Sequence, residues 1–502
     1  MKHDDSKLHT EGVVADVVRF ALPEDLTALD ELLLKGDAWP TTRPIMTLAL
    51  VLSGTPAAGR VEAAFDKAIN AVPRMRQRVA RSVWTMGRAS WVDVEEFELS
   101  YHLRRIGAPG DGSLDSALAW ASGGTTAPFD PARPLWDAVL VERLVDGRAL
   151  VVIRAHHAIA DGVRAIQMMA ALLDLEPSPP SASNEDDAAK LPTVLSPNVA
   201  QFLRGVGRTW VTNPVQATGF AQSMSRASVH PARAFAETTS YVRSALRTVD
   251  RGRATPSPLL SGRSNSRRFS TLEVPLDAMK ATAKTNGVTV NDVYLTGLIG
   301  GLRNYHQAFD LVPSDIPLAL PIDVSGDSEH QAGNHISAAI IPAPASIGDP
   351  IERLRVVHEL VASRRAEPGL GALDHLAPTL RQVPARTAIA ALGVHARRVD
   401  LQASNLIGPP FPLYLAGQKV DRMYAFGPLP RVPAMAVLVS YDGVCTIGFT
   451  LDPAAITDTG LFVTCVQEAF EELLDEDQLG GTDQLQPRAP KRASYPPPEG
   501  AS

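Results

Sequence analysis

Two adjacent histidines, His156 and His157, carry the clearest chemical signal in the sequence, because an Asp-Gly pair follows them at a short spacing. A neutral imidazole can accept a proton from a hydroxyl group when its other nitrogen is held in one tautomer. We therefore interpret His157 as a general base and Asp161 as its nearby carboxylate. Asp161 either contacts the imidazole ring or caps the next helix, and the spacing is compatible with both arrangements.

The residues around the histidines predict the elements that hold them. An apolar run from Leu150 to Ala155 predicts a buried strand that ends at the histidines. Apolar residues at helical spacing follow, so we expect a helix over 163–175. His157 then lies in a short strand-to-helix connection, where a rigid frame can hold a base. On an extended backbone His156 points to the opposite side, so we expect a structural role for it.

The pattern His-His-x-x-x-Asp-Gly over 156–162 resembles the HHxxxDG signature of the CoA-dependent acyltransferase superfamily, and particularly that of the bacterial wax ester synthase/diacylglycerol acyltransferase family. Other segments match the motifs of that family in the same order along the chain. They are Pro134-Leu135-Trp136, Asn291-Asp292, Gly333-Asn334-His335-Ile336, Ser404-Asn405 with Gly408-Pro409, Leu413 to Gly417, and Ser440 to Gly443. The resemblance extends from about residue 20 to about residue 475.

The resemblance implies a fold, an activity and a set of site residues. The fold would be α/β, with two chloramphenicol-acetyltransferase-like halves of mixed sheets, a helical crossover and an active-site tunnel between the halves. The activity would be an O-acyl transfer from a fatty acyl-CoA to a lipid alcohol, which yields triacylglycerol or wax ester. His156 and Gly162 would support the site, and Asn291, Asp292 and Trp136 would bind substrate or stabilise the oxyanion.

Several of these assignments have a structural alternative. Asn291 is also placed to cap a helix, and an apolar tryptophan in a strand, such as Trp136, is more often a core residue than a substrate wall. No Gly-x-Ser-x-Gly segment is present, which favours direct transfer in a ternary complex over a covalent acyl-enzyme. Two other functions stay open: an acyltransferase whose donor is tethered to a carrier protein, and a non-catalytic protein that binds acyl-CoA or lipid.

The composition is typical of a soluble globular protein, with 502 residues, 45% of them hydrophobic and 21% charged, and a formal net charge of −7. This charge gives no reason to expect nucleic acid as a partner. The only cysteines are Cys445 and Cys465, and the histidine motif lacks further ligands at metal-binding spacing, so we expect no metal and no cofactor besides acyl-CoA as substrate. Without a run of eighteen apolar residues, we expect a cytoplasmic protein whose contact with membrane or lipid inclusions is peripheral.

Changes in composition divide the chain. We expect a disordered N-terminus (1–17), an N-terminal acyltransferase half (18–176), a linker with basic crossover helices (177–262), a C-terminal acyltransferase half (263–483) and a disordered Pro-rich tail (484–502). Between residues 201 and 270 the chain holds eleven arginines but only two acidic residues. These arginines either attract lipid headgroups or CoA phosphates, or are solvated heads on surface helices.

Hydrophobic periodicity predicts the remaining elements. In the N-terminal half we expect helices at 26–34 and 61–72, and strands at 45–52, 79–85, 90–94, 97–102 and 136–144. In the C-terminal half we expect strands at 269–274, 318–324, 336–342, 434–440 and 445–451, and helices at 276–284, 351–364, 387–398 and 460–474. Gly287 should end the helix at 276–284 in a left-handed conformation, and Thr289 should begin another helix.

Overall fold

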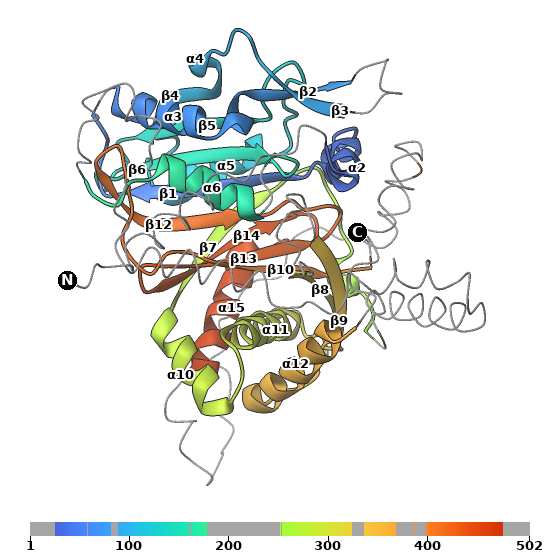
Figure 1. The fold of residues 1–502 in the computed structure, drawn as a ribbon. Coiled ribbons are helices and arrows are strands. Elements are labelled where there is room, and N and C mark those ends of the chain that lie inside the picture. The colour runs from blue at the N-terminus through green and yellow to red at the C-terminus, as the bar shows by residue number, and fades with distance from the viewer. Residues whose placement is uncertain are drawn as a thin grey trace, which may run out of the picture.

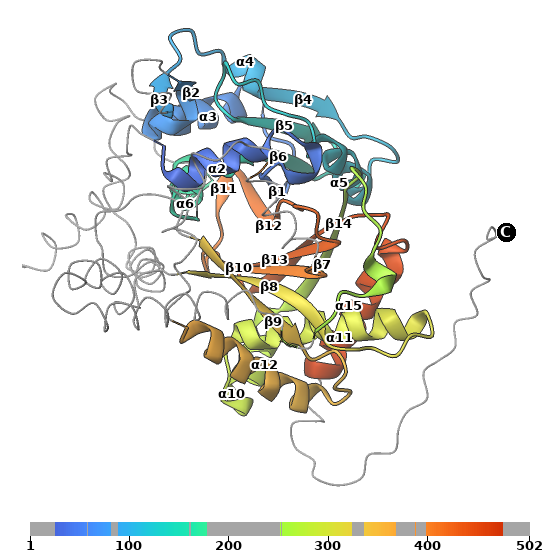
Figure 2. The same cartoon turned by 90° about the vertical axis from the view of Figure 1, so that its right-hand side faces the viewer.

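The computed structural model describes residues 26–57, 59–81, 89–159, 162–177, 252, 254–323, 336–367, 387 and 398–474. Within these residues, two six-stranded sheets with flanking helices form the frame of the molecule (Figures 1 and 2). Both sheets contain parallel and antiparallel strand pairs. The expected α/β class with two mixed sheets is confirmed.

The first sheet contains the strand that carries the histidines. Its strands are β1 (Ile45–Leu52), β4 (Leu103–Gly107), β5 (Trp136–Glu142), β6 (Ala149–His156), β11 (Tyr414–Leu415) and β12 (Gln418–Phe426), in the order β11-β12-β1-β6-β5-β4. The Asp146-Gly147 pair between the expected strands 136–144 and 150–155 predicts a hairpin, which is confirmed: β5 pairs with β6 in antiparallel register, and Gly147 in the turn has a φ of 82°. This turn requires a positive φ, which glycine adopts without steric cost.

Short helices and a hairpin surround the first sheet. They are α2 (Ala28–Gly36), α3 (Arg60–Ala71), α4 (Leu99–His102), α5 (Leu114–Gly124) and α6 (Gly162–Leu172), with the β2 (Gln77–Arg81) and β3 (Ala89–Asp93) hairpin and 3₁₀ turns at Pro40–Thr42 and Pro73–Arg76. The predicted strand at 97–102 is wrong. Its last four residues form the single turn α4, in which the buried ring of His102 lies with Nδ1 2.7 Å from the Trp136 carbonyl oxygen.

The second sheet lies in the C-terminal half. It runs β7-β14-β13-β10-β8-β9, with β7 (Arg268–Pro275), β8 (Ile316–Asp323), β9 (Ile336–Ala343), β10 (Leu401–Ile407), β13 (Ala434–Tyr441) and β14 (Val444–Leu451). One face packs against α10 (Leu276–Asn286), α11 (Val290–Ala308), α12 (Pro350–Arg365) and α15 (Thr459–Leu474), which lie below the sheet in Figure 1. Gly287 ends α10 with a φ of 65°, as predicted. The helix expected at 387–398 lies outside the described residues except for its two ends.

The strand β12 joins the two halves. It belongs to the first sheet, although its residues fall in the part of the chain that we assigned to the C-terminal half. Its last residue, Phe426, stacks on Phe269 of β7 with the ring centroids 3.8 Å apart. Gly448 of β14 faces β12 so closely that a Cβ atom there would clash with the Ala425 carbonyl oxygen. Strand β12 of the first sheet therefore packs directly on the second sheet.

A buried serine–histidine pair anchors the chain to α11 just before the second sheet begins. His306 donates from Nδ1 to the Leu302 carbonyl oxygen, 2.7 Å away, so its Nε2 is the acceptor for the Ser257 hydroxyl at 2.6 Å. The Ser257 backbone N–H donates to Asp400 Oδ2 at 2.7 Å. Burial lowers the pKa of His306 and so favours the neutral imidazole that accepts from Ser257.

The Ser257–His306 contact predicts a loss of stability in mild acid. The unfolded chain protonates His306 near the ordinary histidine pKa of about 6.5, whereas the folded chain resists protonation to lower pH. The unfolded state thus binds more protons, and stability falls as pH drops below about 6.5. We expect the melting temperature to fall from pH 7.5 to pH 5.5 by less in His306→Gln than in the wild type. His102, whose pKa is also lowered, contributes a fall of its own to both proteins. An equal fall in both proteins would contradict this assignment.

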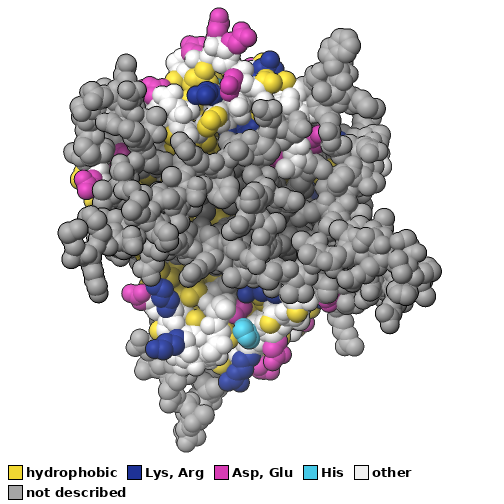
Figure 3. Space-filling model, viewed as in Figure 1, with side chains coloured by type: hydrophobic (Ala, Val, Ile, Leu, Met, Phe, Trp, Pro, Cys, Tyr) yellow, Lys and Arg dark blue, Asp and Glu magenta, His cyan; other side chains and the backbone are white. Residues whose placement is uncertain are grey.

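The visible surface carries mixed charge. On the face shown in Figure 3, basic and acidic side chains intermingle over the described residues in view. Most of the Arg-rich segment at 201–270 lies outside the described residues, as do the termini 1–17 and 484–502, and the two interpretations of its arginines stay predictions. Among the residues that the structure describes, no helix is both long and apolar enough to cross a membrane.

Candidate active site

Backbone hydrogen bonds clamp the two histidines at the end of β6. The His156 N–H donates to the Leu135 carbonyl oxygen at 2.9 Å, and the His157 N–H donates to the Pro44 carbonyl oxygen at 2.8 Å. Pro44 directly precedes β1, and Leu135 directly precedes β5. The segment Pro134-Leu135-Trp136 and the histidine motif are therefore neighbours in space, and the starts of two strands hold the histidine backbone.

The His156 side chain supports the turn that follows it. It is fully buried, and its Nδ1 accepts the Ala158 backbone N–H at 3.0 Å. Since Nδ1 is an acceptor, Nε2 carries the ring proton, and it lies 3.3 Å from Asp37 Oδ2. Sequence reasoning missed Asp37, because nothing local connects the end of α2 with β6. These contacts support the structural role expected for His156.

His157 occupies the first position of the turn. Its residue is partly buried and its Nδ1 atom is buried, while the next two residues, Ala158 and Ile159, are fully buried and anchor the turn in the core. Asp161 lies outside the described residues, so its contact with the ring stays a prediction. Gly162 is the first residue of α6, which confirms that a helix begins there.

Trp136 packs as a core residue. It is 1% exposed, and its ring stacks on Phe65 and His102 with centroid distances of 5.7 Å and 4.7 Å. Its Nε1–H donates to the Met75 carbonyl oxygen at 2.7 Å. It also contributes to the lining of a small surface pocket together with Arg154. These contacts satisfy the indole, and its role as a substrate wall stays a prediction.

The Asn291-Asp292 segment begins α11, and its two residues have different partners. Thr289 caps the helix and forms a capping box with Asp292, which is buried. Asp292 Oδ2 accepts from the Thr289 N–H at 2.9 Å and lies 2.9 Å from Nδ1 of His358. Asn291 is not the cap. Its Oδ1 accepts from Asn405 Nδ2 at 3.3 Å, which brings together two motif asparagines that are far apart in the sequence.

The structure thus forms two groups of motif residues. The histidines and Trp136 belong to the first sheet, whereas Asn291 and Asn405 lie between α11 and β10 of the second sheet. Leu406, next to Asn405, packs against two hydrophobic clusters. One is the core of the first sheet, and the other includes Met435 and Val437 of β13 in the second sheet. The asparagine pair therefore borders the junction between the halves. The segment 333–335 lies outside the described residues.

The two cysteines are buried and free. Burial raises the pKa of Cys445 and of Cys465 to about 11. Near neutral pH both groups are protonated thiols, and a thiol is a far weaker nucleophile than a thiolate. Neither cysteine is therefore suited to form a covalent acyl intermediate.

Comparison with known proteins gives consistent results across the chain. Residues 26–294 match the wax ester synthase/diacylglycerol acyltransferase catalytic domain, and residues 332–474 match the C-terminal domain of the same family. A protein of Mycobacterium tuberculosis (strain H37Rv) named "Putative diacyglycerol O-acyltransferase Rv2484c" is 36% identical over 460 residues, which cover 90% of this chain and 92% of that protein.

Solved structures share the fold. A wax ester synthase/diacylglycerol acyltransferase from Marinobacter aquaeolei VT8 superimposes with a TM-score of 0.59 at 20% identity and covers 91% of this chain and 100% of that one. The starter condensation domain of rhizomide synthetase, in complex with C8-CoA and Leu-SNAC, superimposes with a TM-score of 0.53 at 15% identity, over 93% of this chain and 97% of that one. The match of residues 26–294 to the catalytic-domain model, with the 36% identity to the mycobacterial relative, shows that the chain belongs to the wax ester synthase/diacylglycerol acyltransferase family.

Proposed function

We propose that this chain is an O-acyltransferase that transfers a fatty acyl group from acyl-CoA to a lipid alcohol, either a diacylglycerol or a long-chain fatty alcohol. The observation that carries the proposal is the clamped turn at the end of β6, which holds His157 between two strand starts and a buried core. Family membership and the name of the mycobacterial relative support the same reaction class. The lipid acceptor would reach the protein by peripheral contact with a membrane or lipid inclusion.

In this mechanism His157 moves one proton in each direction. Its neutral imidazole removes the hydroxyl proton as the alcohol oxygen attacks the thioester carbonyl carbon. The tetrahedral intermediate collapses when the carbon–sulfur bond breaks, and the imidazolium returns the proton to the CoA thiolate. The products are the ester and CoA thiol, so the reaction is balanced without a covalent acyl-enzyme. Asp161 would hold or stabilise the imidazolium.

Asn291 is our candidate for the oxyanion donor. Its side-chain oxygen already accepts a hydrogen bond from Asn405, which orients the amide and leaves its NH₂ group as a donor. A donor that is fixed before the reaction stabilises a developing oxyanion without reorganisation. Asn405 then acts as a positioning residue for Asn291.

The contacts of Asn291 and Asp292 predict that a substitution at Asn291 lowers activity, whereas a substitution at the neighbouring Asp292 lowers stability. Asn291→Ala should lower kcat by about 10²-fold and leave the melting temperature almost unchanged, because it removes a transition-state donor but no cap. Asp292→Ala should cost roughly 1–2 kcal/mol of unfolding free energy by breaking the capping box. Activity per folded molecule should then stay within about threefold. Thermal unfolding and initial rates of both variants test this contrast, and a stability loss confined to Asn291→Ala would contradict it.

A donor tethered to a carrier protein is the second candidate. The fold similarity to a condensation domain is the observation that favours it, and that domain was solved in complex with C8-CoA and Leu-SNAC. The site chemistry is the same for both donors, because the pantetheine thioester is common to CoA and to carrier proteins. The two donors differ only beyond the pantetheine arm. The protein surface that binds either the nucleotide part of CoA or the carrier protein therefore decides which donor is used.

The decisive experiment offers both donors and both acceptors to the full chain. Palmitoyl-CoA and a palmitoyl-loaded acyl carrier protein are each incubated with diacylglycerol or hexadecanol, and lipid products are separated. The proposal predicts ester from palmitoyl-CoA with at least one acceptor. Ester formed only from the carrier-bound donor would move the function to the second candidate. Binding of palmitoyl-CoA with no ester from any combination would indicate a non-catalytic binding protein.

A further inference from the structure

The loop at 427–433, which connects β12 with β13, holds an arginine in an unusual backbone conformation. Arg431 has a φ of 60°, a region that costs a non-glycine residue about 1 kcal/mol or more. Three prolines stiffen this loop, and the Arg431 N–H donates to the Leu429 carbonyl oxygen at 2.8 Å. Strain of this kind persists only where the surrounding structure enforces it, and it often marks functional sites.

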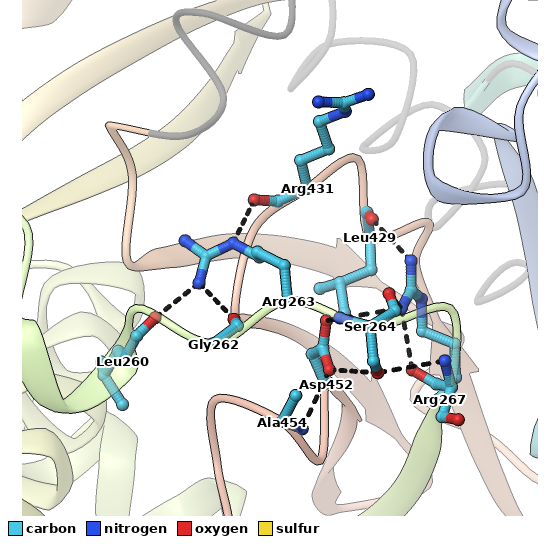
Figure 4. Close-up of polar contacts among 10 residues, drawn as sticks. Leu260, Gly262, Arg263, Ser264, Arg267, Leu429, Arg431, Asp452 and Ala454 are labelled. Carbon is cyan, nitrogen blue, oxygen red and sulfur yellow. Dashed lines mark hydrogen bonds and ion pairs between the residues drawn. The ribbon is translucent and has the colours of Figure 1, made fainter.

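Two other arginines, which lie before β7 in the chain, hold the backbone of this loop (Figure 4). Arg263 donates from Nε to the Arg431 carbonyl oxygen at 2.7 Å, and Arg267 donates from Nη2 to the Leu429 carbonyl oxygen at 3.2 Å. Asp452 completes the network: it accepts from the Ser264 hydroxyl at 2.6 Å and lies 3.7 Å from Arg267 Nη1. Arg263 and Arg267 therefore hold the backbone of this loop, and the side chain of Arg431 takes no part in these contacts.

Among the described residues, no hydrogen-bond partner is found for the Nε of the Arg431 guanidinium. In Figure 4 the guanidinium points away from Arg263 and Arg267. Its Nε is buried. Arginine stays protonated in proteins, and a buried donor without an acceptor is costly. The network contains three arginines and one carboxylate, so the local charge favours an anion at this position.

The sheet topology places the start of this loop and the histidine motif at the same end of the first sheet. Both β6 and β12 pair with β1: His156 is opposite Ile45, and Phe426 is opposite Thr47. The two strands thus finish at the same end of the first sheet. With β1 between them, they are two strand spacings apart, or roughly 10 Å. The loop with Arg431 leaves the first sheet directly after Phe426, at the same end of that sheet as the turn that holds His157.

We propose that Arg431 binds a phosphate of the CoA portion of the acyl donor, while the pantetheine arm extends to His157. This assignment rests on the proposed acyl-CoA-dependent function. A guanidinium recognises phosphate oxygens through paired, charge-assisted hydrogen bonds, which matches the donors that Arg431 leaves unused. A phospholipid headgroup presents the same phosphate chemistry. The position of the loop at the end of the first sheet that carries the His157 turn favours the phosphate of CoA.

The test measures the dissociation constants of CoA and of pantetheine with the full chain by calorimetry. Arg431→Asn removes the guanidinium, and asparagine tolerates a positive φ, so the fold is retained. We expect it to weaken CoA binding by about 10- to 100-fold and pantetheine binding by less than about twofold. The matched control is Arg143→Asn, since Arg143 also has a positive φ (57°) and is exposed in the β5–β6 hairpin. It should change both constants by less than about twofold.

Two results would overturn the assignment: unchanged CoA binding in Arg431→Asn, or an equal loss for CoA and pantetheine. If CoA affinity is unchanged but binding to phosphatidylglycerol vesicles is lost, the arginine is assigned to a lipid headgroup. If the wild type bound CoA through Arg431 but formed no ester, the proposed function would fail while this assignment stood. Binding and turnover are therefore tested separately.

Discussion

Replacing His157 with alanine should reduce the release of CoA from palmitoyl-CoA by about 10²- to 10⁴-fold, the range typical of a lost general base. The base is required for attack by the alcohol but not for holding the donor, so the affinity for palmitoyl-CoA should change by less than about threefold. Initial rates with a thiol reagent and calorimetric titration measure the two quantities on the same protein.

The matched control is His156→Ala, at the neighbouring position. His156 accepts the Ala158 N–H and faces Asp37, so its loss should lower stability by roughly 1–3 kcal/mol through unpaired buried groups. Activity per folded molecule should remain within about tenfold of the wild type, because the proton-transfer group is intact. Equal losses of activity in the two variants, with both proteins folded, would contradict the assignment of a single base.

The second large effect is expected at Trp136, where packing and substrate contact make different predictions. Trp136→Ala removes a fully buried ring that stacks on two neighbours, which should cost about 3–5 kcal/mol in urea unfolding. Trp136→Phe keeps most of the packing and loses only the hydrogen bond to Met75, for roughly 1 kcal/mol.

The milder variant also tests the substrate-wall interpretation of Trp136. If the indole is purely a core residue, Trp136→Phe should leave the preference among acyl-CoA chain lengths unchanged. A shifted chain-length preference at nearly unchanged stability would instead show that the ring borders the acyl chain. Trp136→Ala cannot make this distinction, because its loss of stability alone would lower the measured activity.

Local signals in the sequence predict much of this fold. The continuous apolar run of β1 and the Asp146-Gly147 turn between β5 and β6 are properties of a few neighbouring residues, and they were sufficient for correct elements. The same holds for the end of α10 at Gly287, where the chain needs a left-handed residue. Capping at Thr289 follows the same logic, since its partner Asp292 is only three residues away.

Long-range pairing is what sequence reasoning did not predict. The strand β10 was missed, and so was β12, which crosses into the first sheet. Pairing with β1 depends on a partner several hundred positions earlier in the chain. The contact of Asp37 with His156, like that of Asn405 with Asn291, has the same origin. The sequence motifs single out candidate site residues, but the partners of these residues are set by the packing of sheets and helices from distant segments.

The most direct test of the proposed function is a stoichiometry. Radiolabelled palmitoyl-CoA is incubated with the wild-type chain and an excess of diacylglycerol or hexadecanol, and CoA thiol and labelled ester are quantified from the same reaction. Direct transfer predicts one mole of ester for each mole of thiol, and neither product above the enzyme-free rate when the alcohol is omitted. Thiol release that yields free palmitate in place of ester, whatever alcohol is present, would contradict the account and indicate a thioesterase.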